Sequence, residues 1–282
     1  MIKEFGIRLA TLLIVATVWC PAASYALSMT TAAYYIPSTY TTSAKANTNV
    51  GGFYGFFGQD QHALEIGFDQ ITLASTGAAV QHNYLGIYTY YMPTSAYKIG
   101  YLRINTPTDF ANMVLVGGEW DTYNSYGYKD WSAGLDVYTS FYNLTTGRPL
   151  LIQGTPSYTK HFQAFDLPGS FEFNPKLNIE YNLGQRRFYN NAELAMKYYM
   201  NPAWTFGVRY WTGESVYGVS NGGFVVNNTD DVVKQGYAIN ATYAITPQLS
   251  TVLSYQSNTM SNSAILGDFS QNKISYMLMY NW

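Results

Sequence analysis

The stretch KISYMLMYNW, residues 273–282, decides the fold of this chain. Every second position in it is large and apolar or aromatic, namely Ile274, Tyr276, Leu278, Tyr280 and Trp282. Successive side chains of a β-strand point to opposite faces, so a period of two indicates a strand with one apolar face. The stretch therefore predicts a β-strand whose apolar face ends on Trp282.

The same alternation recurs along most of the chain. Asp130–Tyr142 shows it most clearly, and it returns at residues 177–182, 191–198, 204–210 and 236–243. These segments predict an all-β protein. A soluble β-sandwich would alternate in the same way, so the period alone leaves the environment of the apolar face open.

The amino-acid composition indicates which environment the apolar face contacts. Of the 282 residues only 11% are charged, against roughly 25% in soluble domains. The mean hydropathy of −0.11 is too polar for a bundle of membrane helices. Low charge with 28 tyrosines is typical of a membrane protein built from strands. The pI of about 5.9 provides no basic surface for a nucleic acid, which we exclude as a partner.

The N-terminal residues 1–26 have the pattern of a secretory signal peptide. Lys3 and Arg8 precede the apolar run Leu9–Trp19, which is too short to span a membrane as a helix, and small residues precede a cleavage site after Ala26. Residues 27–282 then form a single domain without cysteine, which rules out disulfides and thiolate metal sites in it. Removal of the peptide changes the net charge from −2 to −3.

The C-terminal strand resembles the last strand of Gram-negative outer-membrane β-barrels. In those proteins a terminal aromatic residue, preceded by alternating apolar residues, serves in recognition by the barrel assembly machinery. The resemblance implies a porin-like protein of the bacterial outer membrane, in contact with outer-membrane lipid, and identifies no subfamily. It assigns the assembly signal to Ile274, Tyr276, Leu278, Tyr280 and Trp282.

Counting back from the last strand predicts a transmembrane antiparallel up-and-down β-barrel of about 14 strands. The predicted strands are 28–38, 50–58, 61–74, 82–92, 95–105, 110–120, 130–142, 158–172, 176–183, 190–200, 203–214, 233–245, 248–258 and 271–282. An even number suits bacterial single-chain barrels. Pro37 and the pair Gly51-Gly52 interrupt the first two strands, so a 12-stranded barrel after an extended segment is the alternative.

This topology also predicts the two ends of the barrel. Short turns are expected on the periplasmic side, at residues 92–95, 174–176, 201–203 and 246–248, and long polar loops outside, at 213–233 and 257–271. Residues 106–109 are short for an outer loop, and residues 121–129 are long for a periplasmic turn. Four tryptophans are expected in a lipid-facing girdle near the periplasm, namely Trp120, Trp131, Trp204 and Trp282, whereas Trp211 falls on the other face.

Catalytic patterns are weak. Hydrolysis needs a base beside a nucleophile or water, and His161 is expected to face lipid or lie above it. The stretch Tyr255–Asn258 resembles the His-x-Ser-Asn segment of outer-membrane lipid hydrolases, but Gln256 stands at the position of the base. We therefore predict no enzyme, no catalytic residues, no metal site and no cofactor.

Placing the apolar face against lipid sends the charged side chains of the strands inward, since Lys or Arg at mid-depth in lipid costs roughly 2–4 kcal/mol. The predicted pore-lining residues are Glu65, Asp69, Glu119 and Asp136, a loose acidic group, together with Glu180, Glu193, Lys197 and Arg209. Lys98, Lys176, Lys234 and Lys273 are also expected to face inward. A tyrosine-rich inner face is expected at Tyr84, Tyr88, Tyr90, Tyr138 and Tyr142.

A channel for passive diffusion of small polar solutes or ions is the function that this pattern favours, with a weak bias toward cations from the acidic group. A sealed barrel that scaffolds a partner or binds a hydrophobic ligand is the alternative, and residues 28–49 are the expected plug in that case. A lipid-modifying enzyme ranks last, because the catalytic base is missing.

Overall fold

A computed structural model of the chain describes residues 28–123, 129–144, 147–163, 168–216, 218–220, 225–226 and 231–282. The predicted signal peptide lies outside the described residues. Within the described residues, no helix is long and apolar enough to cross a membrane.

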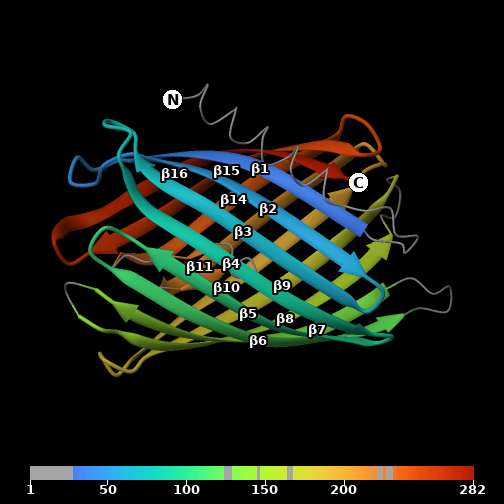
Figure 1. The fold of residues 1–282 in the computed structure, drawn as a ribbon, viewed down its shortest axis with the longest axis horizontal. Coiled ribbons are helices and arrows are strands. Elements are labelled where there is room, and N and C mark those ends of the chain that lie inside the picture. Colours follow the sequence, from blue (N-terminus) through green and yellow to red (C-terminus); the bar gives the residue numbers. More distant parts are fainter. Residues whose placement is uncertain are drawn as a thin grey trace.

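The described chain forms a closed antiparallel β-barrel of fourteen strands, tilted against the long axis (Figure 1). The wall consists of β1 (Ser28–Tyr40), β2 (Thr48–Gln59), β3 (His62–Leu73), β4 (Ala79–Met92), β5 (Ser95–Asn105), β6 (Phe110–Tyr123), β7 (Lys129–Asn143), β8 (Leu150–Gln163), β9 (Ser170–Asn182), β10 (Arg187–Tyr199), β11 (Trp204–Ser215), β14 (Val232–Ala244), β15 (Leu249–Asn262) and β16 (Ile265–Asn281). Each strand pairs with its neighbours in sequence order, and β1 pairs with β16 to close the sheet. Between β11 and β14, the short strands β12 (Val219–Ser220) and β13 (Val225–Val226) form a separate pair.

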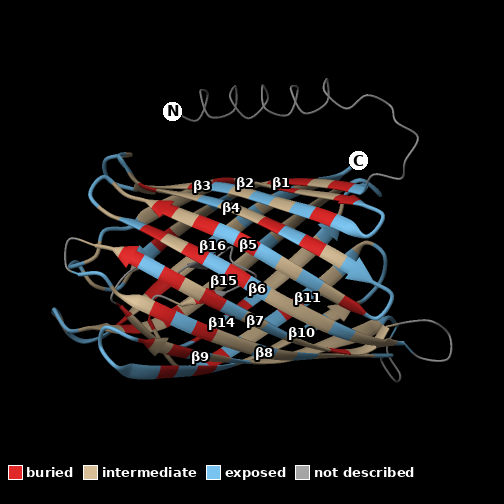
Figure 2. Ribbon diagram, turned by 60° about the horizontal axis from the view of Figure 1, so that its bottom comes forward, coloured by how far each residue is buried: buried red, intermediate tan, exposed pale blue. Residues whose placement is uncertain are grey.

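Large apolar side chains cover the outside of the wall. Along the strands, exposed positions alternate with covered ones (Figure 2). Ile99 and Val116, which face each other across β5 and β6, are each 56% exposed. A closed sheet has no unpaired strand edge, and a continuous apolar exterior can contact lipid. A barrel with both features can span a bilayer. This face is the lipid-facing surface.

The first two strands belong to the wall, so the 12-stranded alternative is wrong. Pro37 lies in β1 where the β1–β16 register is interrupted, between Tyr35 and Ser38, so its missing N–H breaks little pairing. Gly52 lies in β2 beneath the ring of Tyr34, where an added Cβ would come within 2.2 Å of the ring. Both residues that interrupt the sequence pattern therefore have a place in the strands.

The boundary between β8 and β9 differs from the prediction. The predicted strand 158–172 contains the turn between them, and the predicted turn at residues 174–176 lies inside β9. Pro175 faces Leu194 of β10, while the β8–β9 register passes from Ser157–Lys176 to Lys160–Phe173 without it. Pro175 interrupts only the β8–β9 ladder, so strand β9 continues through it. The sequence pattern treats this proline as a turn signal, and the predicted turn therefore lies too late in the chain.

The predicted contrast between short turns and long outer loops holds only in part: the turns expected at 92–95, 201–203 and 246–248 are short and the connection at 213–233 is long, but most other outer loops are short as well. The terminal end of the barrel is the end at which β1 begins and β16 ends, and the other is the loop end. Of the connections at the loop end, only residues 216–231 exceed seven residues. The predicted loop 257–271 is mostly strand, because β15 continues to Asn262 and β16 begins at Ile265.

Some of the tryptophans and tyrosines lie on the face that the sequence predicts, and others lie on the opposite face. The predicted girdle positions Trp120, Trp204 and Trp282 are 52%, 38% and 47% exposed at the terminal end, and Trp211 is buried inside. Three tyrosines predicted to face inward lie outside instead, since they pair with lipid-facing residues of β3; they are Tyr84, Tyr88 and Tyr90. Tyr138 and Tyr142 do face inward and are buried.

Candidate functional site

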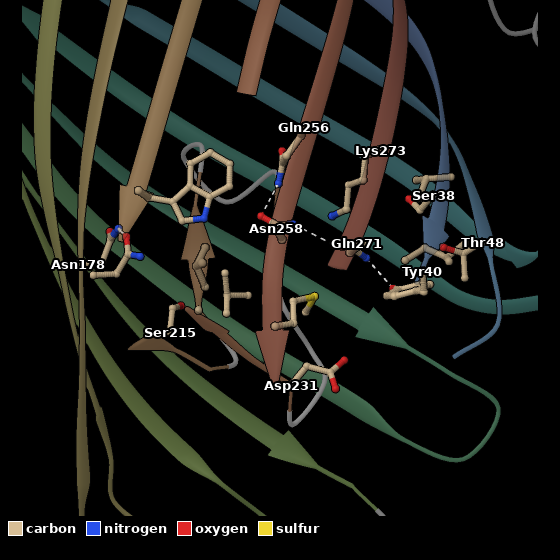
Figure 3. Close-up of a pocket in the computed structure, with 18 of the residues that line it drawn as sticks. Ser38, Tyr40, Thr48, Asn178, Ser215, Asp231, Gln256, Asn258, Gln271 and Lys273 are labelled. Atoms are coloured by element: carbon tan, nitrogen blue, oxygen red, sulfur yellow. Dashed lines mark hydrogen bonds between the residues drawn. The ribbon is translucent and has the colours of Figure 1, made fainter. Parts of the chain in front are cut away.

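A cavity of about 310 Å³ lies inside the barrel toward the loop end (Figure 3). Many of the side chains that line it are polar or charged. They include Tyr40 on β1, Asn178 and Glu180 on β9, Glu193 on β10, Arg209 and Trp211 on β11, Gln256 and Asn258 on β15, and Gln271 and Lys273 on β16. Pockets for small molecules begin at about 300 Å³, so the cavity suits a small solute.

The described residues 216 and 218–220 of the connection between β11 and β14 turn into the barrel and form part of this cavity; they are called the turned-in segment below. Ser215 Oγ donates a hydrogen bond to Glu180 Oε1 at 2.6 Å, and the backbone N–H of Val216 donates to Glu180 Oε2 at 3.0 Å. Farther along, the N–H and C=O of Val219 both bond to the amide of Gln153 on β8, at 2.8 and 2.7 Å. The segment is therefore fixed to the inner wall at two points.

Next to the cavity, part of the inner wall is apolar. Val216 and Val219, each 3% exposed, pack into a cluster of inward-facing residues. The wall contributes Ile87, Leu102, Ile104, Ala111, Met113, Leu115, Tyr138, Tyr142, Leu151 and Tyr189 to this cluster. Burial of such side chains stabilises the packed segment by roughly 1.5–3 kcal/mol each.

Sequence reasoning missed this cluster, although a signal was present. Met113-Val114-Leu115-Val116 is apolar at every position, so both faces of β6 are apolar there. A continuous apolar run indicates a strand that is covered on both faces. The lipid covers one face of β6, and the turned-in segment covers the other.

The residues of the predicted acidic group face inward, but each has a partner. Lys98 Nζ lies 2.8 Å from Asp136 Oδ2, and Lys129 Nζ lies 2.5 Å from Glu119 Oε1. Glu65 accepts a hydrogen bond from Tyr54 at 2.8 Å. Asp69 accepts hydrogen bonds from Tyr34 Oη and Asn83 Nδ2, at 3.3 and 2.7 Å. Lysines therefore offset the charge of Asp136 and Glu119, whereas the hydrogen-bond partners of Glu65 and Asp69 are neutral, so the expected cation bias rests on these two.

The other predicted pore-lining residues, Glu180, Glu193, Lys197 and Arg209, do not form one group in the structure. Glu180 faces inward but is only 1% exposed, because the turned-in segment covers it. Glu193 lies 3.7 Å from Arg209 and 3.9 Å from Lys176, so it joins two cations across neighbouring strands. Lys197 lies nearer the terminal end and pairs with Glu172 at 2.9 Å.

The lysines of these pairs remain partly exposed inside the barrel. The side chains of Lys98, Lys176 and Lys197 point inward by register and remain 30%, 31% and 50% exposed. A side chain that faces inward and stays this exposed borders space open to solvent. The lumen around these lysines therefore has room for water.

The histidines do not gather into a catalytic group. His62 faces outward, with Nδ1 2.6 Å from Tyr88 Oη at the terminal end. His161 faces inward opposite Glu172, so its predicted lipid-facing position was wrong. In the stretch resembling lipid hydrolases, Gln256 borders the cavity, while Ser257 lies on the opposite face of β15. Among the described residues, no group of three or more His, Cys, Asp or Glu side chains could hold a metal ion.

Structural comparison relates this architecture to known outer-membrane barrels. A bacterial polysaccharide outer membrane secretin aligns with a TM-score of 0.50 over 92% of this chain and 100% of its own, at 7% identity. The Pseudomonas putida toluene transporter TodX aligns with a TM-score of 0.50 over 92% of this chain and 90% of its own, at 7% identity. The NanC porin aligns with a TM-score of 0.46 over 88% and 98%, at 10% identity.

No protein-family model matches the chain. No curated protein matches it either. Identities near 10% support a shared fold and leave the transported solute undetermined. The apolar exterior, the closed sheet and the alignments together identify the chain as a 14-stranded β-barrel that shares the fold of known outer-membrane barrels.

Proposed function

We propose that this barrel is a channel for passive diffusion of small polar solutes or ions across the outer membrane. The observation that carries the proposal is the charged lumen with room for water, in which inward-facing lysines keep up to half of their surface exposed. The proposed function involves no chemical step and no cofactor.

The size of the barrel supports this function. Side chains fill a barrel of about eight strands, whereas fourteen strands enclose a wider interior. The turned-in segment and the apolar cluster then occupy one side of that interior at the loop end. Solutes would pass along the polar side, where charged walls filter them by charge and size.

Conductance of the purified protein in a planar bilayer tests the proposal. We expect stepwise current increments, because each inserted open barrel adds one conducting path. Lys197→Glu serves as the control for contaminating channels, since this exposed lumen residue should alter the reversal potential of steps that pass through this barrel. Folded protein that gives no steps would contradict the proposal.

A sealed barrel is the second candidate, and the turned-in segment favours it. The space left beside Val219 in the apolar cluster is only about 10 Å³, room for about one water molecule and too small for a hydrophobic ligand. Residues 28–40, expected as a plug in this case, form the wall strand β1 instead. The sealed form would therefore act as a scaffold rather than as a ligand carrier.

A further inference from the structure

Two long cationic side chains border the cavity on one cross-strand row. Arg209 of β11 is opposite Ala238 of β14, Ala238 is opposite Gln256 of β15, and Gln256 is opposite Lys273 of β16. Residues in register share a face, so this row lies on the inner wall. The guanidinium of Arg209 reaches past the small Ala238 and donates to Gln256 Oε1 at 3.5 Å, so Gln256 lies between the two cations.

The neighbouring row adds an aromatic ring and a chain of amides. The guanidinium of Arg209 lies 4.9 Å from the ring centroid of Trp211. Asn258 Nδ2 donates to Gln271 Oε1 at 3.0 Å, and Gln271 Nε2 donates to Tyr40 Oη at 2.5 Å (Figure 3). Gln256 Nε2 donates to Asn258 Oδ1 at 3.3 Å, which joins this amide chain to the first row.

The carboxylates of the cavity are already engaged. Glu180 holds the turned-in segment, and Asp231 lies 2.8 Å from Lys45. Glu193 is shared between Arg209 and Lys176. Lys273, partly exposed to the cavity, forms no ion pair with a carboxylate of the described chain. Counted together with the partner lysines Lys45 and Lys176, which lie outside the lining, the four cations around the cavity exceed its three carboxylates by about one positive charge.

We propose that the Arg209–Lys273 row is a binding subsite for a small organic anion that carries one carboxylate and several hydroxyl groups. The excess charge matches a singly charged carboxylate better than a doubly charged phosphate. Arg and Lys donate to carboxylate oxygens, and the amides of Gln256 and Asn258 can exchange hydrogen bonds with hydroxyls. The buried ring of Trp211 holds the Arg209 guanidinium in place through a cation–π contact. This subsite deepens the proposed channel function, since it would favour such anions among diffusing solutes.

Flux into liposomes tests the subsite with three probes of similar size: gluconate, glucose and N-methylglucamine. In the wild-type protein we expect the ratio of gluconate flux to glucose flux to exceed the ratio of N-methylglucamine flux to glucose flux. Lys273→Met should lower the gluconate-to-glucose ratio roughly three- to tenfold, the effect of one partly screened, charge-assisted contact. Lys273→Arg should retain most of the wild-type ratio, which also guards against a folding defect in the Met variant.

Lys197→Met is the matched control, because it removes a lumen cation that does not line the cavity. An equal fall of the ratio in both Met variants would show a general field effect and overturn the subsite. An unchanged ratio in Lys273→Met would do the same.

The channel and the subsite can fail separately. If no probe enters the liposomes, the proposed channel fails, and equilibrium dialysis of gluconate against the detergent-solubilised barrel at low salt then tests the subsite. Saturable gluconate binding that is lost in Lys273→Met would support the subsite without a channel. Absence of saturable binding to the wild-type protein would overturn it.

Discussion

Glu180 connects the wall of the barrel to the turned-in segment inside it. Its two carboxylate oxygens accept the hydroxyl of Ser215 and the N–H of Val216. Gly218 lies so close that an added Cβ would come within 2.4 Å of Glu180 Oε1. A buried carboxylate is costly unless hydrogen bonds satisfy it, so Glu180 and the turned-in segment depend on each other.

We predict that Glu180→Ala loosens the turned-in segment. Loss of a buried hydrogen-bond partner costs about 1–3 kcal/mol, and 1.4 kcal/mol corresponds to a tenfold change in protection. Hydrogen exchange at the amide of Val216 should accelerate about tenfold or more, and that of Val219 should follow if the segment opens as one unit. Glu180→Gln, which keeps an acceptor for Val216, should change the exchange less. Equal protection in wild type and the Ala variant would show that packing alone holds the segment.

Among the elements, β16 closes the barrel. It pairs with β15 on one side and β1 on the other, and Trp282 lies at the seam. The backbone N–H of Trp282 donates to Met29 O at 2.9 Å, and its indole N–H donates to Thr31 Oγ1 at 3.2 Å. The rings of Tyr280 and Trp282 meet edge to face, with centroids 4.7 Å apart. The terminal aromatic residue therefore contacts both the last strand and the first.

We predict that deletion of Trp282 impairs insertion into the outer membrane without blocking export. The deletion removes the proposed recognition residue for the barrel assembly machinery and two contacts across the seam. Cell fractionation and heat-modifiable mobility on gels measure the outcome, with Trp282→Phe as the control that keeps an aromatic end. Normal insertion and normal mobility of the truncated protein would contradict the prediction.

In the molecule as a whole, the lumen has two unlike sides at the loop end. Strands β4 to β8, with Tyr189 of β10, present the apolar cluster, while β9 to β11, β14 to β16 and β1 to β4 line the cavity. Lysines on the inner wall offset the charge of Asp136 and Glu119, whereas Glu65 and Asp69 accept hydrogen bonds from neutral groups. Screening over about 8 Å at physiological salt restricts the reach of the remaining charges.

We predict that replacing Asp69 and Asp136 together by Asn shifts the selectivity of the channel toward anions. Asp136→Asn leaves Lys98 without its carboxylate, and Asp69→Asn removes a charge with no cation among its hydrogen-bond partners. The reversal potential in a salt gradient should change most at low salt, while the single-channel conductance changes little. A reversal potential that stays constant at low salt would place these carboxylates outside the conducting path.

The sequence by itself determined the strands, their number and the direction of most side chains. Alternation is a local property, because neighbouring residues of a strand must point to opposite faces. The outward position of Trp282 and the inward positions of Glu193 and Arg209 follow from it. The turn between β8 and β9 was misplaced for an equally local reason: Pro175 imitates a turn signal while lying at a gap in one ladder.

Only the tertiary structure decided what happens inside the barrel. Gln153 holds Val219 from 66 positions away, and Glu180 holds Ser215 from 35 positions away. No local pattern encodes such contacts, because they depend on which strands the closed sheet brings face to face. The partners of the acidic residues and the excess charge beside Lys273 arise in the same way. The period of two determines which face of the sheet most side chains lie on, and closure of the barrel determines which residues they contact there.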